Sequence, residues 1–508
     1  MKRVVGSLIV LVLVIGGFAW LSLRGDDLDP KPVGGEDALA GVPESLRSFY
    51  QQKLTWKSCQ DDFECSSYQV PLDYDHPDKG TITLKMLKAP ASDQKNKLGT
   101  MLVNPGGPGG PAQDYAAGGA SYWGKALRRN YDIIGVDPRG VAASDPVDCV
   151  TDAQLDEIIE SDPTPDTPQE WKRDDKLNQM FFSGCMKRDP EVATHISTEE
   201  AARDMDVLRG ILGETKLTYF GASYGTFLGG TYADLFPERV GRMVLDGAID
   251  PSQTTVQMSL VQAHGFQVAL DAYLQDCVDK GNCYLGDSVE AGQRRIQKFF
   301  EQVDQQPMQV DAVDRELTEG TALYGVILPL YNKDYWSYLD QALGAALKGE
   351  GLQLLALADA YTSRGPGGQF LNNSFQALPV VNCLDYDDPI SQERAIGLIP
   401  RFEKASPTFG RAFVSDLSSC AAWSFQSGKK GATLQATGAD PILVVGTTRD
   451  PATPLSWAKA LSAQLDNSVL LIRDGDGHTG YNAGNQCTDD AIESYLVEGK
   501  VPADNTRC

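Results

Sequence analysis

Short apolar runs alternate with helix-like stretches along much of the chain, and this alternation is the strongest constraint on its fold. The runs lie at residues 101–103, 133–136, 217–220 and 243–245, and each leads into a loop or turn. Strands that alternate with helices form a largely parallel sheet with helices on both faces. Two further runs, at 442–445 and 469–472, indicate that the C-terminal part completes the same sheet.

The alternation stops between about residues 251 and 430, where the sequence is typical of helices and loops. We therefore expect a large, mainly helical cap at 251–430, inserted into an α/β core. The first part of that core is predicted at 45–250 and the last part at 431–508. The core begins with a predicted hairpin, because strand-like segments at 68–72 and 81–87 flank a turn rich in proline, glycine and aspartate.

The pentapeptide Gly-Ala-Ser-Tyr-Gly at 221–225 has the pattern of a sharp turn from a strand into a helix. The central residue of such a turn, here Ser223, has a strained backbone and a hydroxyl exposed above the sheet. The alternative is an ordinary glycine-rich turn. A serine hydroxyl is a poor nucleophile without an adjacent base, so the decision depends on whether suitable partners follow.

Both partners follow Ser223 in the chain order of the α/β-hydrolase fold, each on a loop after a strand. Asp450 follows the run at 442–445, and His478 follows the run at 469–472. We expect Asp450 to orient His478, which takes the serine proton and returns it to the leaving group. Asp474 and Asp476 are weaker candidates because they lie too close to His478 in the sequence. The remaining histidines are interpreted as structural or surface residues: His76, His195 and His264.

The glycine-rich loop at 104–110 suits an oxyanion hole, because glycines leave backbone N–H groups unshielded. We favour Gly107 as the first donor, with Gly106 as the alternative. The second donor is expected to be the backbone N–H of Tyr224, next to the nucleophile. Phosphate binding is disfavoured because the loop lacks the lysine of phosphate-binding loops. Arg139, in the loop after the run at 133–136, is interpreted as one half of a structural ion pair.

A short basic start precedes an apolar run at residues 4–23. The segment 1–24 is either a cleaved signal peptide or a signal anchor, since about 20 apolar residues can span a bilayer. In the second case Lys2 and Arg3 stay on the cytoplasmic side and residues 4–23 hold the protein in the membrane. Both alternatives export the rest of the chain, which follows a predicted linker at 25–44.

Ten cysteines fit export, because an even number in an exported chain favours disulfides. Pairing of neighbours along the chain is the simplest hypothesis: 59–65, 149–185, 277–283, 383–420 and 487–508. A zinc site is not indicated, since the chain has no Cys-x-x-Cys and its four histidines are scattered. We expect neither a metal nor an organic cofactor.

The net charge is −24, from 45 basic and 69 acidic residues. An acidic surface repels phosphate backbones, so nucleic acid is not an expected partner. The charge is typical of a solvated acidic surface and says nothing specific about substrate.

Together these segments resemble the secreted bacterial tripeptidyl aminopeptidases and the related prolyl aminopeptidases of the α/β-hydrolase superfamily. The resemblance covers about residue 45 to the end and is weakest in the cap. One departure is Ala142, which stands where the family usually has a glycine. The matching segments lie at 70–74, 104–110, 137–140, 221–226, 245–247, 450–454, 477–480 and 495–508.

The resemblance implies an α/β-hydrolase fold and cleavage of short peptides from a free amino terminus. An exopeptidase of this kind binds an ammonium group, and carboxylates in the cap can do so by charge-assisted hydrogen bonds. Asp385, in an acidic cluster beside Cys383, is the candidate, with a solvated loop charge as the alternative. An esterase or other acyl hydrolase stays open, because the same three residues serve any acyl group that the pocket admits.

Overall fold

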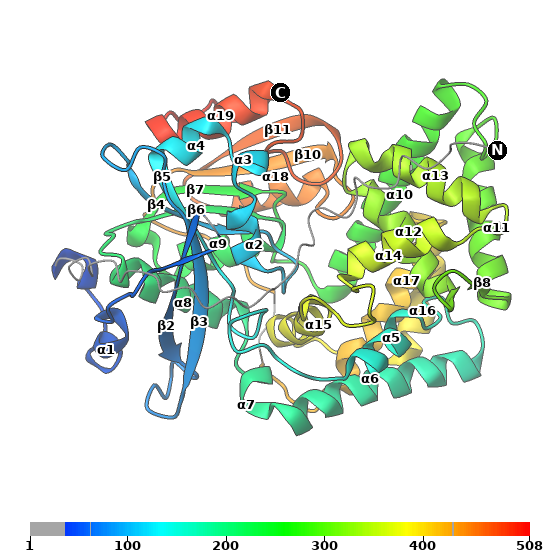
Figure 1. Ribbon diagram of the computed structural model, residues 1–508, viewed down its shortest axis with the longest axis horizontal. Helices are drawn as coiled ribbons and strands as arrows, with labels where there is room; N and C mark the ends of the chain where they lie inside the picture. The colour runs from blue at the N-terminus through cyan, green and yellow to red at the C-terminus, as the bar shows by residue number, and fades with distance from the viewer. Residues whose placement is uncertain (1–35, 61, 429–430) are drawn as a thin grey trace, which may run out of the picture.

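The apolar runs form one sheet of ten strands in the computed structural model, which describes residues 36–60, 62–428 and 431–508 (Figure 1). The leader predicted at 1–24 lies outside the described residues, as does most of the predicted linker. No helix in the described ranges has the length and apolar character needed to cross a bilayer. In spatial order the strands are β1 (Lys57–Cys59), β2 (Phe63–Pro71), β3 (Thr81–Ala89), β5 (Tyr131–Val136), β4 (Gly99–Asn104), β6 (Leu217–Ala222), β7 (Val240–Asp246), β10 (Ile442–Arg449), β11 (Ser468–Asp476) and β12 (Thr506–Arg507).

The sheet is antiparallel at one edge and parallel elsewhere. The strands β1, β2, β3 and β5 pair antiparallel, and all pairs from β5 to β12 are parallel. The pairing of β2 with β3 confirms the predicted hairpin. The mostly parallel arrangement confirms the predicted fold class, and it brings the carboxyl ends of β6, β7, β10 and β11 to the same edge.

Both faces of the sheet are buried, because successive side chains of a strand point to opposite sides. In β10, Ile442 and Val444 pack into one core, and Leu443 and Val445 pack into the other. The first core is covered by α8 (Thr198–Ile211), α9 (Tyr224–Leu235) and α18 (Leu455–Gln464). The second is covered by α2 (Ala112–Ala117), α4 (Lys125–Asn130) and α19 (Gln486–Glu498).

Arg139 holds the loop after β5 in place. Its buried guanidinium donates to both carboxylate oxygens of Asp204 in α8, at 2.7 and 2.6 Å. It also donates to the backbone carbonyls of Pro71 and Leu72 at the end of β2. The predicted ion pair is therefore confirmed, and it connects a loop, a strand and a helix.

Between β7 and β10 the chain forms a helical cap with its own hydrophobic core, beside the sheet (Figure 1). Apolar helix faces, for example Phe299, Val326 and Leu339, fill that core. The elements of the cap are α10 (Thr255–Asp279), α11 (Val289–Gln305), β8 (Met308–Val310), β9 (Arg315–Leu317), α12 (Glu319–Leu330), α13 (Trp336–Ala346), α14 (Leu352–Thr362), α15 (Ser374–Asp385), α16 (Gln392–Ala405), α17 (Gly410–Ser415) and the 3-10 helix η5 (Asp416–Ala422).

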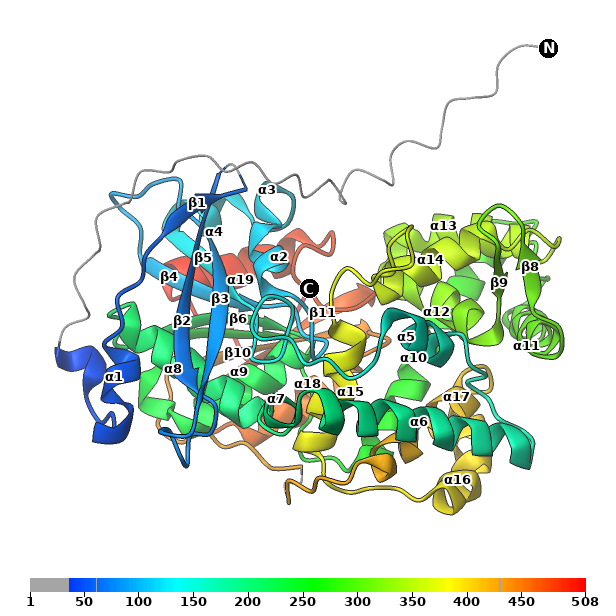
Figure 2. The same ribbon diagram turned by 60° about the horizontal axis from the view of Figure 1, so that its bottom comes forward.

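A second stretch, between β5 and α8, packs against the cap. It contains α5 (Asp152–Ile159), α6 (Pro168–Arg188) and α7 (Pro190–Ala193), and α6 runs along the cap helices (Figure 2). Ion pairs join it to the cap: Arg364 contacts Asp156 at 2.7 Å, and Arg315 contacts Glu160 at 3.3 Å. Sequence analysis assigned these helices to the first part of the core, because helical periodicity does not say which neighbour a helix covers.

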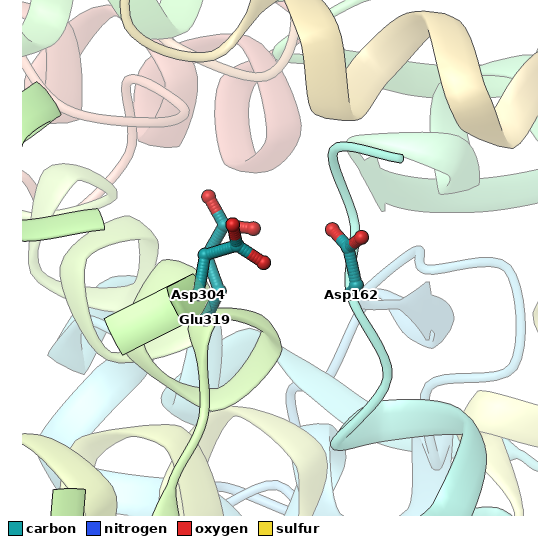
Figure 3. Close-up of side chains that lie close together, drawn as sticks. All are labelled: Asp162, Asp304 and Glu319. Atoms are coloured by element: carbon teal, nitrogen blue, oxygen red, sulfur yellow. The ribbon is translucent and has the colours of Figure 1, made fainter. Parts of the chain in front are cut away.

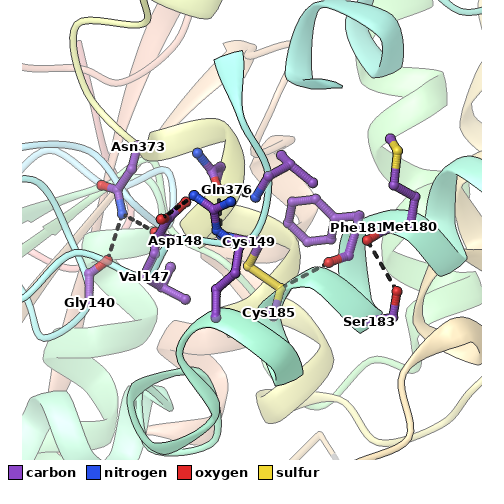
Figure 4. Close-up of a disulfide and its surroundings, with 12 residues drawn as sticks. Gly140, Val147, Asp148, Cys149, Met180, Phe181, Ser183, Cys185, Asn373 and Gln376 are labelled. Carbon is purple, nitrogen blue, oxygen red and sulfur yellow. Dashed lines mark hydrogen bonds and ion pairs between the residues drawn. A yellow bond between two sulfur atoms is a disulfide. The ribbon is translucent and has the colours of Figure 1, made fainter. Parts of the chain in front are cut away.

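The Cys149–Cys185 disulfide joins the start of this stretch to α6 (Figure 4). Beside it, the side-chain carbonyl of Gln376 in α15 accepts from the backbone N–H groups of Cys149 and Val150, at 2.7 and 3.1 Å. Asn373 donates to the carbonyls of Gly140 and Val147. These contacts hold the stretch against α15, the cap helix that packs against the core of the sheet (Figure 2).

All five predicted disulfides are present, and no described cysteine is free. Disulfides form and persist in oxidising compartments, so five of them indicate a protein that folds outside the cytoplasm.

Removal of the Cys149–Cys185 disulfide should destabilise the protein more than removal of a disulfide that closes a short loop. The paired residues are 36 positions apart, against 6 for Cys59–Cys65. Loop entropy gives a loss in unfolding free energy of about 4 kcal/mol for Cys149→Ala/Cys185→Ala and about 2 kcal/mol for Cys59→Ala/Cys65→Ala. Denaturant unfolding without reductant measures both, and equal losses would contradict the explanation.

Candidate active site

Ser223 lies at the turn between β6 and α9, with φ 56° and ψ −125°. A positive φ is uncommon for a residue with a side chain and marks local strain. Neighbouring groups hold this backbone: the Ser223 N–H donates to the Asp246 carbonyl at 2.9 Å, and Thr226 donates to the Ser223 carbonyl through its N–H and its hydroxyl. The turn also requires glycine at 221, because a Cβ there would lie 2.2 Å from the carbonyl oxygen of Gly225.

Asp450 and His478 meet at the carboxyl edge of the sheet. The Nδ1 atom of His478 lies 2.8 Å from Oδ1 and 3.0 Å from Oδ2 of Asp450. The carboxylate is 2% exposed and accepts further hydrogen bonds from the backbone N–H groups of Ala452, Thr453 and Thr479. These donors fix its orientation and keep a buried charge solvated.

The two alternative acids have other partners. Asp476 pairs with Arg449 and Lys333, and Asp474 pairs with Arg449. Burial alone would lower the pKa of His478, but the charge of Asp450 and its hydrogen bond outweigh that effect, so the pKa is raised. The arrangement stabilises an imidazolium, which a general base becomes after it takes a proton.

The dipeptide Asp246-Gly247 links the serine turn to the histidine loop. The Asp246 carbonyl accepts from Ser223, and a Cβ on Gly247 would lie 3.3 Å from Cε1 of His478. The Asp246 side chain accepts from the N–H groups of Gly480 and Tyr481, at 2.7 and 2.9 Å, and so holds the loop after His478. Burial raises the pKa of Asp246 to about 6. Sequence analysis assigned no role to Asp246; its position at the end of a strand was the only signal.

The loop after β4 touches the serine turn. A Cβ on Gly106 would lie 2.8 Å from both the Cβ of Ser223 and the backbone nitrogen of Tyr224, so only glycine fits this close approach. The N–H of Gly106 is already used, because it donates to Oδ1 of Asn104 at 2.9 Å. The N–H groups of Gly107 and Tyr224 have no acceptor among the described residues.

Asp385 lies behind the serine turn, where it is 6% exposed. Its carboxylate accepts from the N–H of Thr198 at 2.9 Å and from the Thr198 hydroxyl at 2.5 Å. The same hydroxyl contacts the phenol of Tyr224. Both oxygens of Asp385 thus have protein partners at the start of α8.

Several known proteins have sequences similar to this chain. A family model described as TAP-like protein matches residues 406–508. The serine protease Hip1 of Mycobacterium tuberculosis is 34% identical over 457 residues, which cover 87% of both chains. Carboxylesterase B of the same organism is 33% identical over 509 residues, 96% of both chains. The tripeptidyl aminopeptidase of Streptomyces lividans is 28% identical over 472 residues, 90% of this chain and 86% of that one.

The chain belongs to the tripeptidyl aminopeptidase family of α/β hydrolases. It is a serine hydrolase, and the family predicted from its sequence motifs is confirmed.

The cap of this hydrolase contacts the histidine loop directly. The backbone N–H of His478 donates to the carbonyl of Tyr331, which follows α12, at 2.8 Å. The Tyr331 ring lies edge-on to the imidazole, with 5.3 Å between ring centroids. Lys333 pairs with Asp476 in the same loop at 3.1 Å. The cap therefore helps to position the histidine.

A cluster of three carboxylates joins the stretch before α6 to the cap (Figure 3). Oxygen atoms of Asp162, Asp304 and Glu319 all lie within 4.8 Å of one another, a set that a hard cation could use. Burial and the charges of the two aspartates raise the pKa of Glu319 to about 8. A protonated Glu319 can donate a hydrogen bond to Asp162.

The variant Glu319→Gln should flatten the pH dependence of stability. Because the folded-state pKa of about 8 exceeds the ordinary value of 4.5, Glu319 binds its proton more tightly in the folded protein. Its stabilising contribution is therefore complete below the ordinary pKa and is lost as pH rises to about 8. Between pH 5 and 9, we expect the unfolding free energy of the variant to fall by at least about 1 kcal/mol less than that of the wild type.

Urea unfolding between pH 5 and 9 measures this effect. The matched control is Glu350→Gln, since Glu350 is an exposed acid of the same cap. An unchanged pH profile in Glu319→Gln would show that the cluster is not protonated as described.

Proposed function

We propose that this serine hydrolase removes short peptides from the free amino terminus of peptide substrates, through an acyl-enzyme on Ser223. The observation that carries the proposal is the 2.8 Å contact between His478 and Asp450 at the sheet edge where the strained serine turn also lies. The relatives named as a serine protease and a tripeptidyl aminopeptidase support a peptidase.

In the proposed mechanism, His478 takes the proton of the Ser223 hydroxyl, whose oxygen attacks the scissile carbonyl. Asp450 holds the imidazole in the required tautomer and stabilises the imidazolium. The tetrahedral intermediate collapses when His478 gives its proton to the leaving amine. A water molecule, activated by the same histidine, then releases the peptide acid and regenerates the serine.

The backbone N–H groups of Gly107 and Tyr224 are the proposed oxyanion donors. Both lack an acceptor among the described residues, whereas Gly106 already donates to Asn104. Pre-oriented donors of this kind stabilise the charge that develops on the carbonyl oxygen, since they need no reorganisation during the reaction.

Hydrolysis of esters is the second candidate function, because the carboxylesterase B relative covers 96% of the chain. The same nucleophile, base and donors would serve an ester, so only the binding groups of the pocket distinguish the two substrates.

We further propose that the enzyme works outside the cytoplasm, after export directed by residues 1–24. The five disulfides support this location. The segment 4–23 is then either removed with the signal peptide or retained as a membrane anchor.

The variant Ser223→Ala should lower kcat by roughly 10⁴-fold, because the nucleophile and its base act as a unit. Peptide release from a chromogenic tripeptidyl substrate measures the rate, and thermal unfolding checks that the fold is intact. Activity near that of the wild type would exclude the acyl-enzyme mechanism.

The substrate class is tested with three reporters: a free-amine tripeptidyl anilide, its N-acetylated twin and a short-chain p-nitrophenyl ester. For an aminopeptidase we expect kcat/KM to fall by at least about 10-fold on acetylation, because the charge that the site recognises is lost. Indifference to acetylation, together with fast ester turnover, would favour the esterase.

A further inference from the structure

A chain of hydrogen bonds joins Asp385 of the cap to Tyr224, the residue after the candidate nucleophile. The Thr198 hydroxyl donates to Oδ2 of Asp385 at 2.5 Å, and the Thr198 N–H donates to Oδ1 at 2.9 Å. The same hydroxyl lies 2.5 Å from the phenol oxygen of Tyr224. All three side chains are buried. Because a threonine hydroxyl has a single hydrogen, which goes to Asp385, the phenol of Tyr224 donates to Thr198.

The charge of Asp385 supports this direction of the chain. Burial and that charge both raise the pKa of Tyr224, so its phenol keeps its proton and remains a donor. Hydrogen bonds in series polarise one another, and a fully satisfied buried network is rigid. The chain therefore holds the end of the Tyr224 side chain against Thr198, the first residue of α8.

Tyr224 is also the first residue of α9, and its backbone N–H is one of the two proposed oxyanion donors. The side chain and the N–H belong to the same residue, so an anchored phenol restricts how far that N–H can turn. A donor of this kind stabilises the oxyanion only when it is aimed at the position where the charge develops. A misplacement of about 1 Å can lower the rate by roughly 10²-fold.

The same cap helix touches the loop that carries the other proposed donor. Ser374 is the first residue of α15 and Asp385 is the last. A Cβ on Gly109 would lie 3.0 Å from the carbonyl oxygen of Ser374, so the first turn of α15 packs closely against the loop after β4. The segments that carry both proposed donors, Gly107 and Tyr224, are thus in contact with α15, directly or through Thr198.

We propose that Asp385 is a positioning residue for the oxyanion hole: through Thr198 it holds the phenol of Tyr224, and with it the Tyr224 N–H. The inference rests on the proposed function, since it concerns a donor of that mechanism. It gives Asp385 a role other than recognition of the substrate ammonium, because Thr198 donates to both of its oxygens. Since Asp385 belongs to the cap, the position of the cap and the stabilisation of the transition state are coupled.

The variant Tyr224→Phe tests the inference, because it removes one oxygen atom and leaves the donation from Thr198 to Asp385 in place. Two inhibitors are compared: a tripeptidyl aldehyde and the corresponding tripeptide acid. The aldehyde carbon bonds to the Ser223 oxygen while His478 takes the proton, so this adduct carries an oxyanion and the bound acid does not. We expect the variant to bind the aldehyde roughly 10- to 100-fold more weakly, with binding of the acid unchanged. The kcat for the tripeptidyl anilide should fall by a similar factor, with little change in KM.

Substitutions further along the chain should act through the same donor. Asp385→Asn and Thr198→Val should also weaken binding of the aldehyde selectively, whereas Thr198→Ser, which keeps the hydroxyl, should bind it as the wild type does. The double variant Tyr224→Phe/Asp385→Asn should bind the aldehyde no more weakly than the weaker single variant, because both substitutions break one chain. Losses that multiply in the double variant would contradict the inference.

The matched control is Tyr232→Phe. Tyr232 is a buried residue of the same helix α9, and its phenol donates to Asp206 at 3.3 Å. This variant should keep the wild-type ratio of aldehyde to acid binding. An unchanged ratio in Tyr224→Phe, or an equal fall in Tyr232→Phe, would overturn the inference.

Thermal unfolding checks the fold of each variant. Tyr224→Phe leaves no donor of the chain unpaired, so it should unfold near the wild-type temperature, and failure to fold would contradict the inference. A wild type that binds the aldehyde no more tightly than the acid would instead refute the proposed acyl-enzyme mechanism itself.

Discussion

The contact between His478 and Asp450 depends on the parallel pairing of β10 with β11. In that register Arg449 lies opposite Asp476, so both strands end together and their following loops meet. The neighbouring strand β7 contributes Asp246, whose carbonyl accepts the N–H of Ser223. Because helices bury the sheet on both faces, these loop starts are held at fixed relative positions. The loops that carry Asp450 and His478 can therefore meet without a long mobile segment.

Two buried carboxylates at the candidate site are held by backbone donors. Asp450 receives backbone N–H donors from Ala452, Thr453 and Thr479, and Asp246 receives two more from the histidine loop. Such donors replace the water that burial removes. Both acids therefore hold the candidate site together.

The cap contacts the candidate active site directly. The carbonyl of Tyr331 accepts the backbone N–H of His478, and its ring lies against the imidazole. The helix α15 contacts the core side through Gln376 and Asn373, beside the Cys149–Cys185 disulfide. A shift of the cap would therefore change the contacts that help to position His478.

Much of this architecture could be predicted from local patterns. Apolar runs with the period of strands indicated the sheet, glycines around Ser223 indicated the turn, and chain order singled out Asp450 and His478 as the pair that meets. Each cysteine paired with its neighbour along the chain, as expected. Each of these features follows from a few consecutive residues or from the order of the motifs along the chain.

The roles of Asp246 and Asp385 depended on the tertiary structure. The sequence alone does not distinguish a carboxylate that accepts backbone donors from one that supports the start of a helix. The difference lies in neighbours such as Thr198 and Tyr481, which are up to about 235 positions away. Likewise, the helical pattern of α6 did not reveal that it covers the cap. Sequence by itself determined the elements and the candidate reactive groups, and packing decided which neighbours each carboxylate has, because burial and distance arise only when the chain is folded.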